Sequence, residues 1–181
     1  MPAADPRAST PRQRLILAVL LLLGASLRLC NLGHRSLSTD EANVFWMARG
    51  TSGEIVLHNA AGNSAPPLYA LALNPLAEAH ASEAVLRSLS YAAGVAALVA
   101  LYVLARDYSG PAGALFAVFV AAVSPSQVFY AQFLREYSSA FLCATLLLLA
   151  FTRFQRRPIW RTWIALTLVG GLSLFVHTTS R

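Results

Sequence analysis

Charged residues are scarce in this chain: 12% of its 181 residues are charged, whereas 56% are hydrophobic. A soluble domain of this length carries roughly twice that charged fraction. The apolar residues are also gathered in long runs rather than spread along the chain. Together these features exclude an ordinary soluble domain and predict an all-α protein embedded in a lipid bilayer.

Lysine is absent, so the excess of positive charge comes from arginine alone. A basic chain can bind nucleic acid, but that function favours arginines gathered on one amphipathic stripe. Here the arginines bracket the hydrophobic runs, as topology signals of membrane proteins do. We therefore expect the lipid bilayer as a partner and no nucleic acid.

Cysteine is nearly absent too, since only Cys30 and Cys143 are present. Both fall in or beside apolar runs, and neither has the Cys/His spacing of a metal site. Two isolated cysteines do not make a disulfide framework. We expect both to be ordinary lipid-buried or core residues.

About five transmembrane helices are predicted from the apolar runs. In chain order the expected spans are residues 14–29, 87–105, 112–134, 137–151 and 162–176. The third is interrupted at Ser124-Pro125, and the turn residues before it make it an antiparallel neighbour of the second. Between the first two spans lies a long segment with two short apolar stretches, 42–48 and 66–79, which suit helices at the membrane interface.

The first apolar run, residues 15–27, is short for a span and follows two arginines, a pattern that also fits a signal peptide. Arg28 and its bulky neighbours make a poor cleavage site. We therefore favour a helix over residues 14–29 whose Arg28 extends to the far membrane interface. Residues 1–13 have no apolar period and are predicted to be a disordered cytoplasmic tail.

The orientation follows from the arginine distribution. The links predicted to be cytoplasmic hold more arginines than the outer ones, although the first outer segment is far longer. The positive-inside rule therefore predicts a multi-pass protein of the cell membrane with a cytoplasmic N-terminus. Most of the acids then fall on the extracytoplasmic side: Asp40, Glu41, Glu54, Glu78, Glu83 and Glu136.

The adjacent acids Asp40 and Glu41 follow the first apolar run closely. Two carboxylates beside a membrane span must face water or an aqueous cavity, where they can serve proton or metal chemistry. The stretch from Ser38 to Glu41 also fits a capping box, in which Glu41 reaches back to the start of a helix and Asp40 favours its dipole. A structural and a functional role therefore both remain open, because capping would also hold Asp40 ionised.

Four further side chains at the outer ends of the expected spans are candidates for binding an anionic substrate. Arg135 and Tyr137 flank Glu136 at the start of the fourth span, and arginine matches phosphate geometry. Arg87 begins the second span, and His177 lies just past the fifth. Structural alternatives are an interfacial ion pair for the first group, snorkelling for Arg87 and a plain interfacial histidine for His177.

Several short motifs occur in a characteristic order along the chain. They are Leu27-Arg28-Leu29, Leu32-Gly33, Ser36-Leu37, Asp40-Glu41-Ala42, Pro66-Pro67-Leu68-Tyr69, Arg87-Ser88-Leu89-Ser90, Ser124-Pro125 and Arg135-Glu136-Tyr137. Their order and spacing over residues 14–180 resemble the N-terminal part of the membrane glycosyltransferases of the protein O-mannosyltransferase and aminoarabinose-transferase group (glycosyltransferase family 39-like). These enzymes share the GT-C fold. The bacterial dolichyl-phosphate-mannose-protein mannosyltransferase-like members look closest.

This resemblance implies a polyprenyl-phosphate donor and an inverting transfer of a mannose-like hexose at the extracytoplasmic face. The acceptor would be a protein, a lipid or a glycan. By similarity, Asp40 is the general base for the acceptor hydroxyl or a ligand of a divalent metal such as Mg²⁺ or Mn²⁺, and Glu41 is the assisting acid. Arg135 and Tyr137 fall in the region that faces the catalytic cavity of such enzymes.

Two features depart from the family pattern. Relatives often have histidine directly before the Pro-Pro pair, where this chain has Ala65. Relatives are also much longer, so residues 14–181 are interpreted as the N-terminal part of a GT-C-type domain. Two alternatives to an enzyme stay open: a non-enzymatic module that binds or transports lipid-linked sugars, and an inactive truncated fragment. The acids stand at span ends rather than along a path within the spans, which favours the enzyme.

Overall fold

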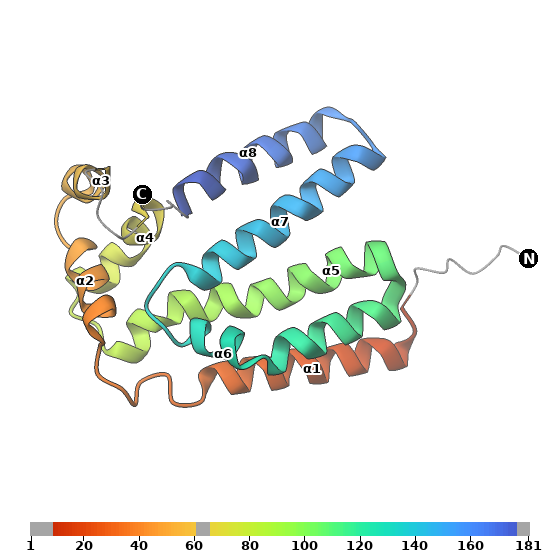
Figure 1. Ribbon diagram of the computed structural model, residues 1–181, viewed down its shortest axis with the longest axis horizontal. Helices are drawn as coiled ribbons and strands as arrows, with labels where there is room; N and C mark the ends of the chain where they lie inside the picture. The colour runs from red at the N-terminus through yellow and green to blue at the C-terminus, as the bar shows by residue number, and fades with distance from the viewer. Residues whose placement is uncertain (1–8, 61–65, 177–181) are drawn as a thin grey trace, which may run out of the picture.

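The computed structural model describes residues 9–60 and 66–176, and these residues are helical apart from turns and short loops. The helices are α1 (Pro11–Leu29), α2 (Thr39–Met47), α3 (Ser52–Ala60), α4 (Pro67–Glu78), α5 (Glu83–Val123), α6 (Pro125–Ala131), α7 (Tyr137–Arg156) and α8 (Trp160–Val176). The long helices lie alongside one another, and α2, α3 and α4 gather at one end (Figure 1). The predicted all-α class is confirmed.

Helix α5 is a hairpin of two helices that meet at Gly110. Its φ of 71° and ψ of −178° break the helix, and glycine adopts a positive φ at little cost. Pro111 then opens the second half, where its fixed φ suits a first helical turn. The two halves run back along each other (Figure 1), which confirms the expected antiparallel pair.

Large apolar side chains remain exposed along α1, α7, α8 and the second half of α5. A bundle in water would bury most of them, so a hydrocarbon surrounding explains this surface. Among the described residues, two helices are long and apolar enough to cross a membrane, Glu83–Val123 and Tyr137–Arg156, and Trp160–Val176 is a shorter apolar helix. The fold therefore agrees with a helical membrane protein. The third expected span ends at Val123, because Pro125 starts the separate helix α6.

Helix α1 begins earlier than predicted. Thr10 caps it by accepting a hydrogen bond from the Gln13 N–H (3.3 Å), and the Gln13 side chain accepts one from the Thr10 N–H (2.9 Å). Pro11 occupies the first turn, which its ring geometry favours. The predicted disordered tail is therefore wrong for residues 11–13, and residues 1–8 lie outside the described part of the chain.

Arg28 points into the helix bundle, so the prediction that it snorkels to the interface is wrong. Its side chain is 1% exposed. One terminal nitrogen donates to the carbonyls of Gly24 (2.9 Å) and Ala122 (3.1 Å), and the other donates to the carbonyl of Ala121 (3.0 Å). The physical reason is the break after α5: Pro125 has no N–H to give the Ala121 carbonyl, so that carbonyl is available to Arg28.

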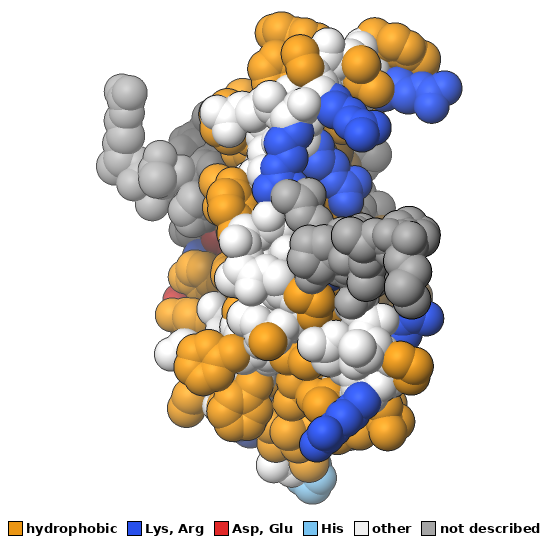
Figure 2. Space-filling model, turned by 90° about the vertical axis from the view of Figure 1, so that its right-hand side faces the viewer, with side chains coloured by type: hydrophobic (Ala, Val, Ile, Leu, Met, Phe, Trp, Pro, Cys, Tyr) orange, Lys and Arg blue, Asp and Glu red, His pale blue; other side chains and the backbone are white. Residues whose placement is uncertain are grey.

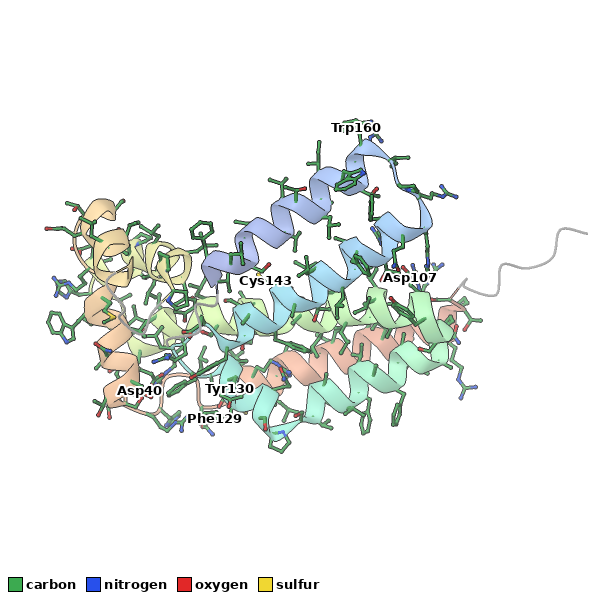
Figure 3. All side chains as sticks on the ribbon, turned by 45° about the horizontal axis from the view of Figure 1, so that its top comes forward. Asp40, Asp107, Phe129, Tyr130, Cys143 and Trp160 are labelled. Carbon is green, nitrogen blue, oxygen red and sulfur yellow. The ribbon has the colours of Figure 1, made fainter. Side chains whose placement is uncertain are left out.

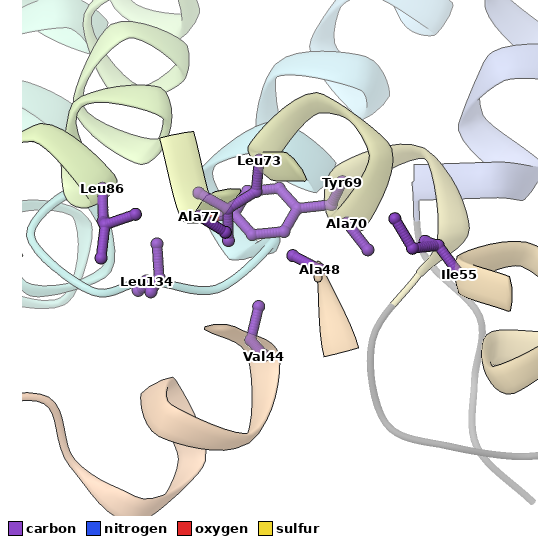
Figure 4. Packing of buried hydrophobic residues seen from close by; sticks show 9 residues of the cluster. All are labelled: Val44, Ala48, Ile55, Tyr69, Ala70, Leu73, Ala77, Leu86 and Leu134. Atoms are coloured by element: carbon purple, nitrogen blue, oxygen red, sulfur yellow. The ribbon is translucent and has the colours of Figure 1, made fainter. Parts of the chain in front are cut away.

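Helices α2, α3 and α4 pack on one another and are here called the cap. One apolar core joins the cap to α5 and to the turn before α7 (Figure 4): Val44, Ala48, Ile55, Tyr69, Ala70, Leu73, Ala77, Leu86 and Leu134. Helices α2 and α4 confirm the two short helices expected in this segment, whereas α3 is not predicted by the sequence. The shared core fixes the cap on the ends of the long helices.

Candidate functional site

The start of α2 carries the capping box that the sequence predicts. Ser38 Oγ accepts a hydrogen bond from the Glu41 N–H (3.4 Å), and Glu41 Oε2 accepts from the Ser38 N–H (3.0 Å) and hydroxyl (3.1 Å). Asp40 therefore lies in the first turn of a capped helix. Since consecutive helical residues project about 100° apart, the two carboxylates of the pair point in different directions.

Glu41 points inward and forms a buried ion pair with Arg87. Arg87 Nε donates to Glu41 Oε1 (2.8 Å), and Arg87 Nη2 donates to Oε2 (3.0 Å). The Leu134 N–H also donates to Oε1 (2.9 Å). Glu41 is only 2% exposed, and Arg87 is only 1% exposed. This one carboxylate therefore ties α2 to α5 and to the turn that precedes α7.

The other N–H groups of Arg87 bind the loop between α1 and α2. They donate to the carbonyls of Leu32 (2.9 Å), Arg35 (2.9 Å) and Ser36 (3.3 Å). All five guanidinium N–H groups are thus used within the protein. Arg87 does not snorkel, and in this arrangement it has no donor left for a substrate. Its predicted role in substrate binding stays a prediction to which this geometry adds no support.

The pKa of the Glu41 carboxyl is set by opposing effects. Burial raises it, but the hydrogen bonds from Arg87, Ser38 and Leu134 and the positive charge of Arg87 outweigh burial and lower it below the ordinary value of 4.5. Glu41 is therefore a carboxylate near neutral pH, with both oxygens engaged. It is positioned to hold the fold together, and its role as an assisting acid stays a prediction.

Asp40, in contrast, is exposed and makes no hydrogen bond or ion pair with the described residues. Figure 3 shows it on α2 at the end of the molecule that carries the cap. Its backbone is held by the capping box and, one residue further on, by the Glu41–Arg87 pair. The structure therefore fixes where Asp40 is placed and leaves its carboxylate open to solvent.

Residues 132–136 form an irregular turn that brings Arg135 and Tyr137 together. The Arg135 guanidinium lies 5.6 Å from the centroid of the Tyr137 ring, and its Nε is 3.3 Å from Glu136 Oε2. Gln132 fixes the start of the turn by donating to the carbonyls of Leu27 (2.9 Å) and Cys30 (2.7 Å). A mostly buried cation and a partly exposed phenol thus lie side by side.

A buried hydroxyl pair that sequence reasoning missed supports this turn. Ser90 Oγ donates to the Arg135 carbonyl (3.0 Å), so the Tyr69 hydroxyl, 2.8 Å from Ser90, must be the donor to Ser90. Burial raises the pKa of Tyr69 above its ordinary value, which keeps the phenol protonated. The sequence does contain a signal for the buried position of Ser90, because Ser90 is three residues after Arg87 and hence on the same helical face.

Two of the predicted roles cannot be placed in the geometry. His177 lies outside the described residues. In the described part of the chain, no group of three or more His, Cys, Asp or Glu side chains could hold a metal ion. Glu41 is turned toward Arg87, so the acid pair does not supply two ligands to one ion. The described residues thus do not by themselves fit a metal at Asp40, and we derive no step through one.

The fold and this polar site define a helical membrane protein with a fixed, solvent-facing acid at one end of its helices. A family model described as dolichyl-phosphate-mannose-protein mannosyltransferase matches residues 64–180, well over half of the chain. The chain therefore belongs to this family of membrane glycosyltransferases of the GT-C type. The matched region contains Arg87, Arg135, Tyr137 and His177, whereas Asp40 and Glu41 precede it. No curated protein and no solved structure matches the chain.

Proposed function

We propose that this protein transfers a mannose-like hexose from a polyprenyl phosphate to an extracytoplasmic acceptor hydroxyl, with inversion, and that Asp40 is the general base. The main support for the proposal is the difference in burial and bonding between Asp40 and Glu41. Glu41 is buried and fully bonded, whereas Asp40 is exposed and has no partner among the described residues. A general base needs a fixed position and a free carboxylate oxygen, and Asp40 has both.

In the proposed reaction, an Asp40 oxygen takes the proton of the acceptor hydroxyl. The acceptor oxygen attacks the anomeric carbon from the side opposite the phosphate, and the bond from that carbon to the phosphate oxygen breaks. The electron pair of this bond leaves with the polyprenyl phosphate. Arg135 can stabilise the charge of the departing phosphate, because guanidinium groups bind phosphate oxygens strongly. Tyr137, beside Arg135, offers a further hydrogen-bond donor.

The distribution of charge supports an extracytoplasmic position for Asp40. The end opposite the cap contains the start of α1, the Gly110 turn and the link between α7 and α8 (Figure 1). Arginine side chains gather at this end, where few acids are visible (Figure 2). The described arginines in these segments are Arg12, Arg14, Arg106, Arg153, Arg156, Arg157 and Arg161. By the positive-inside rule, that end faces the cytoplasm and the cap faces outward.

Replacing Asp40 with asparagine in the full-length protein tests the assignment. We expect Asp40→Asn to lower the rate of sugar transfer by about 10²- to 10⁴-fold, because the amide cannot accept the proton. The thermal unfolding midpoint should change little, since the Asp40 side chain has no partner to lose. The rate is measured as transfer of a radiolabelled sugar from a polyprenyl-phosphate donor.

The matched control is Thr39→Ala, at an exposed neighbouring position, which should retain the wild-type rate. Undiminished transfer by Asp40→Asn would overturn the assignment of the base. Donor binding without turnover in the wild-type protein would favour the non-enzymatic binding or transport module instead. The same assay, run with a chelator and then with added Mg²⁺ or Mn²⁺, tests the separate prediction of a divalent metal.

A further inference from the structure

We propose that a groove beside α1 and α6 binds an anionic membrane phospholipid. The groove has a volume of about 640 Å³ and lies between the end of α1, the loop after it, the end of α5 and α6. Its lining includes none of Asp40, Arg135 and Tyr137. The groove thus shares no lining residue with the residues proposed for catalysis, and the proposal does not depend on the function of Asp40.

The polar part of the groove favours a negatively charged group. It consists of Arg35, His34, Asn31 and Gln132, and none of the described carboxylates lines the groove. The Arg35 side chain is exposed and makes no hydrogen bond or ion pair with the described residues; its guanidinium lies 5.7 Å from the centroid of the Phe129 ring. A phosphate diester can accept hydrogen bonds from this free guanidinium. The ammonium of a zwitterionic head group, in contrast, finds no acid here.

Hydrogen bonds with the backbone hold two of these polar residues, Arg35 and Gln132, in place before any ligand binds. The carbonyl of Arg35 accepts a hydrogen bond from Arg87 (2.9 Å), so the loop that carries the free guanidinium is fixed to the buried ion pair. The amide nitrogen of Gln132 donates to the carbonyls of Leu27 and Cys30, so its remaining polar atom is an acceptor that suits a hydroxyl of the head group and not its phosphate. A preformed site loses less conformational entropy on binding.

The apolar part of the groove suits an acyl chain. Leu27, Val123, Val128 and Phe129 line it, and the exposed side chains of Phe119 and Val120 continue the apolar surface along α5. The groove lies where the apolar helices α1 and α5 end, the level at which head groups and interfacial aromatic side chains are found. Charge on one side and hydrocarbon on the other together indicate a phospholipid with a net negative head group.

Native mass spectrometry of the full-length protein, offered equal amounts of phosphatidylglycerol and phosphatidylcholine, tests this site. We expect the wild-type protein to retain phosphatidylglycerol preferentially and Arg35→Gln to lower that preference about fivefold, the effect of one arginine near an anionic head group. Arg49→Gln is the control for net charge, because Arg49 lies in the link between α2 and α3, pairs with Glu78 (3.9 Å) and does not line the groove. Val128→Trp, which fills the groove without changing the charge, should also abolish the preference.

Several results would overturn the proposal. An unchanged preference in Arg35→Gln, or an equal loss in Arg49→Gln, would mean that general surface charge attracts the lipid. A preference that survives Val128→Trp would place the lipid elsewhere. Displacement of phosphatidylglycerol by a polyprenyl phosphate at equal concentration would make the groove the donor site. None of these outcomes bears on Asp40, whose test is the rate of sugar transfer.

Discussion

The cap and the helix bundle are each held together by one buried arginine, and the two arginines have different partners. Arg87 fixes the cap, where it pairs with the Glu41 carboxylate and binds three carbonyls. Arg28 fixes α1 to α5 within the bundle, and among the described residues it binds carbonyls only. Both are 1% exposed. A buried guanidinium in this protein is thus stabilised either by an acid or by the carbonyls at a broken helix end.

The two buried arginines depend on different partners. The Glu41–Arg87 pair joins segments far apart in the chain, and each partner is a buried charge that depends on the other. Arg28 depends on carbonyl dipoles at the C-terminal end of the second half of α5, where a positive charge is favoured by the helix dipole. Removing one member of the pair should therefore disturb the fold more than removing Arg28.

Arg87→Met should destabilise the protein most. It leaves the Glu41 carboxylate buried and unpaired, so we expect the free energy of unfolding to fall by about 3 to 5 kcal/mol. Glu41→Gln should also destabilise, and the double variant should lose less than the sum of the two. Denaturant unfolding in detergent micelles measures all three. Strictly additive losses would show that the two side chains do not stabilise the fold as a pair.

A smaller loss, about 1 to 3 kcal/mol, is expected for Arg28→Met, because carbonyls are left unsatisfied but no buried charge is left behind. Arg28→Lys should recover part of it, since an ammonium keeps the charge and some donors. The same unfolding measurement applies. If Arg28→Met proved as damaging as Arg87→Met, the distinction between the two regions would fail.

Ser38→Ala should cost about 1 kcal/mol, the usual effect of removing a helix cap. Here it also removes a hydrogen bond to Glu41 (3.1 Å), so it tests whether the cap supports the ion pair. Thr39→Ala changes the adjacent exposed position and is the control. Equal unfolding midpoints for the two variants would contradict a stabilising role of the capping box.

The smallest effect is expected from mild acid. Because the folded pKa of Glu41 lies below 4.5, its stabilisation is complete above pH 4.5 and is lost as the pH falls through the lower folded value. The difference in unfolding midpoint between the wild-type protein and Glu41→Gln should therefore be constant at pH values well above 4.5 and shrink as the pH falls below 4.5 toward the folded value. A difference that stays constant or grows in that acid range would show that the pKa is not lowered by folding.

Local features were predictable from sequence because their partners are close along the chain. The capping box from Ser38 to Glu41 needs contacts across only three residues, and it is found as predicted. The turn at Gly110 likewise rests on the conformational freedom of glycine and on Pro111. The position of Asp40 in a first helical turn belongs to this group, although its chemical role stays a proposal.

The buried polar contacts were not predictable in this way. Arg28 and Arg87 both stand at ends of apolar runs, where snorkelling is the ordinary expectation. Their inward direction depends on acceptors 46 to 94 residues away in the chain, namely Glu41 for Arg87 and the Ala121 and Ala122 carbonyls for Arg28. The spacing of residues along the chain does not indicate hydrogen-bond acceptors so far away in the sequence.

The sequence alone determined that this is an all-α membrane protein with an acid pair at a helix start, because hydropathy and capping act over neighbouring residues. The different roles of Asp40 and Glu41 follow from the tertiary packing. Glu41 faces Arg87 and becomes a buried structural carboxylate, whereas Asp40, one residue earlier, faces outward and stays free. The physical reason is that a charge can be buried only where the fold brings its partner, and Arg87 lies on the side of α2 that Glu41 faces.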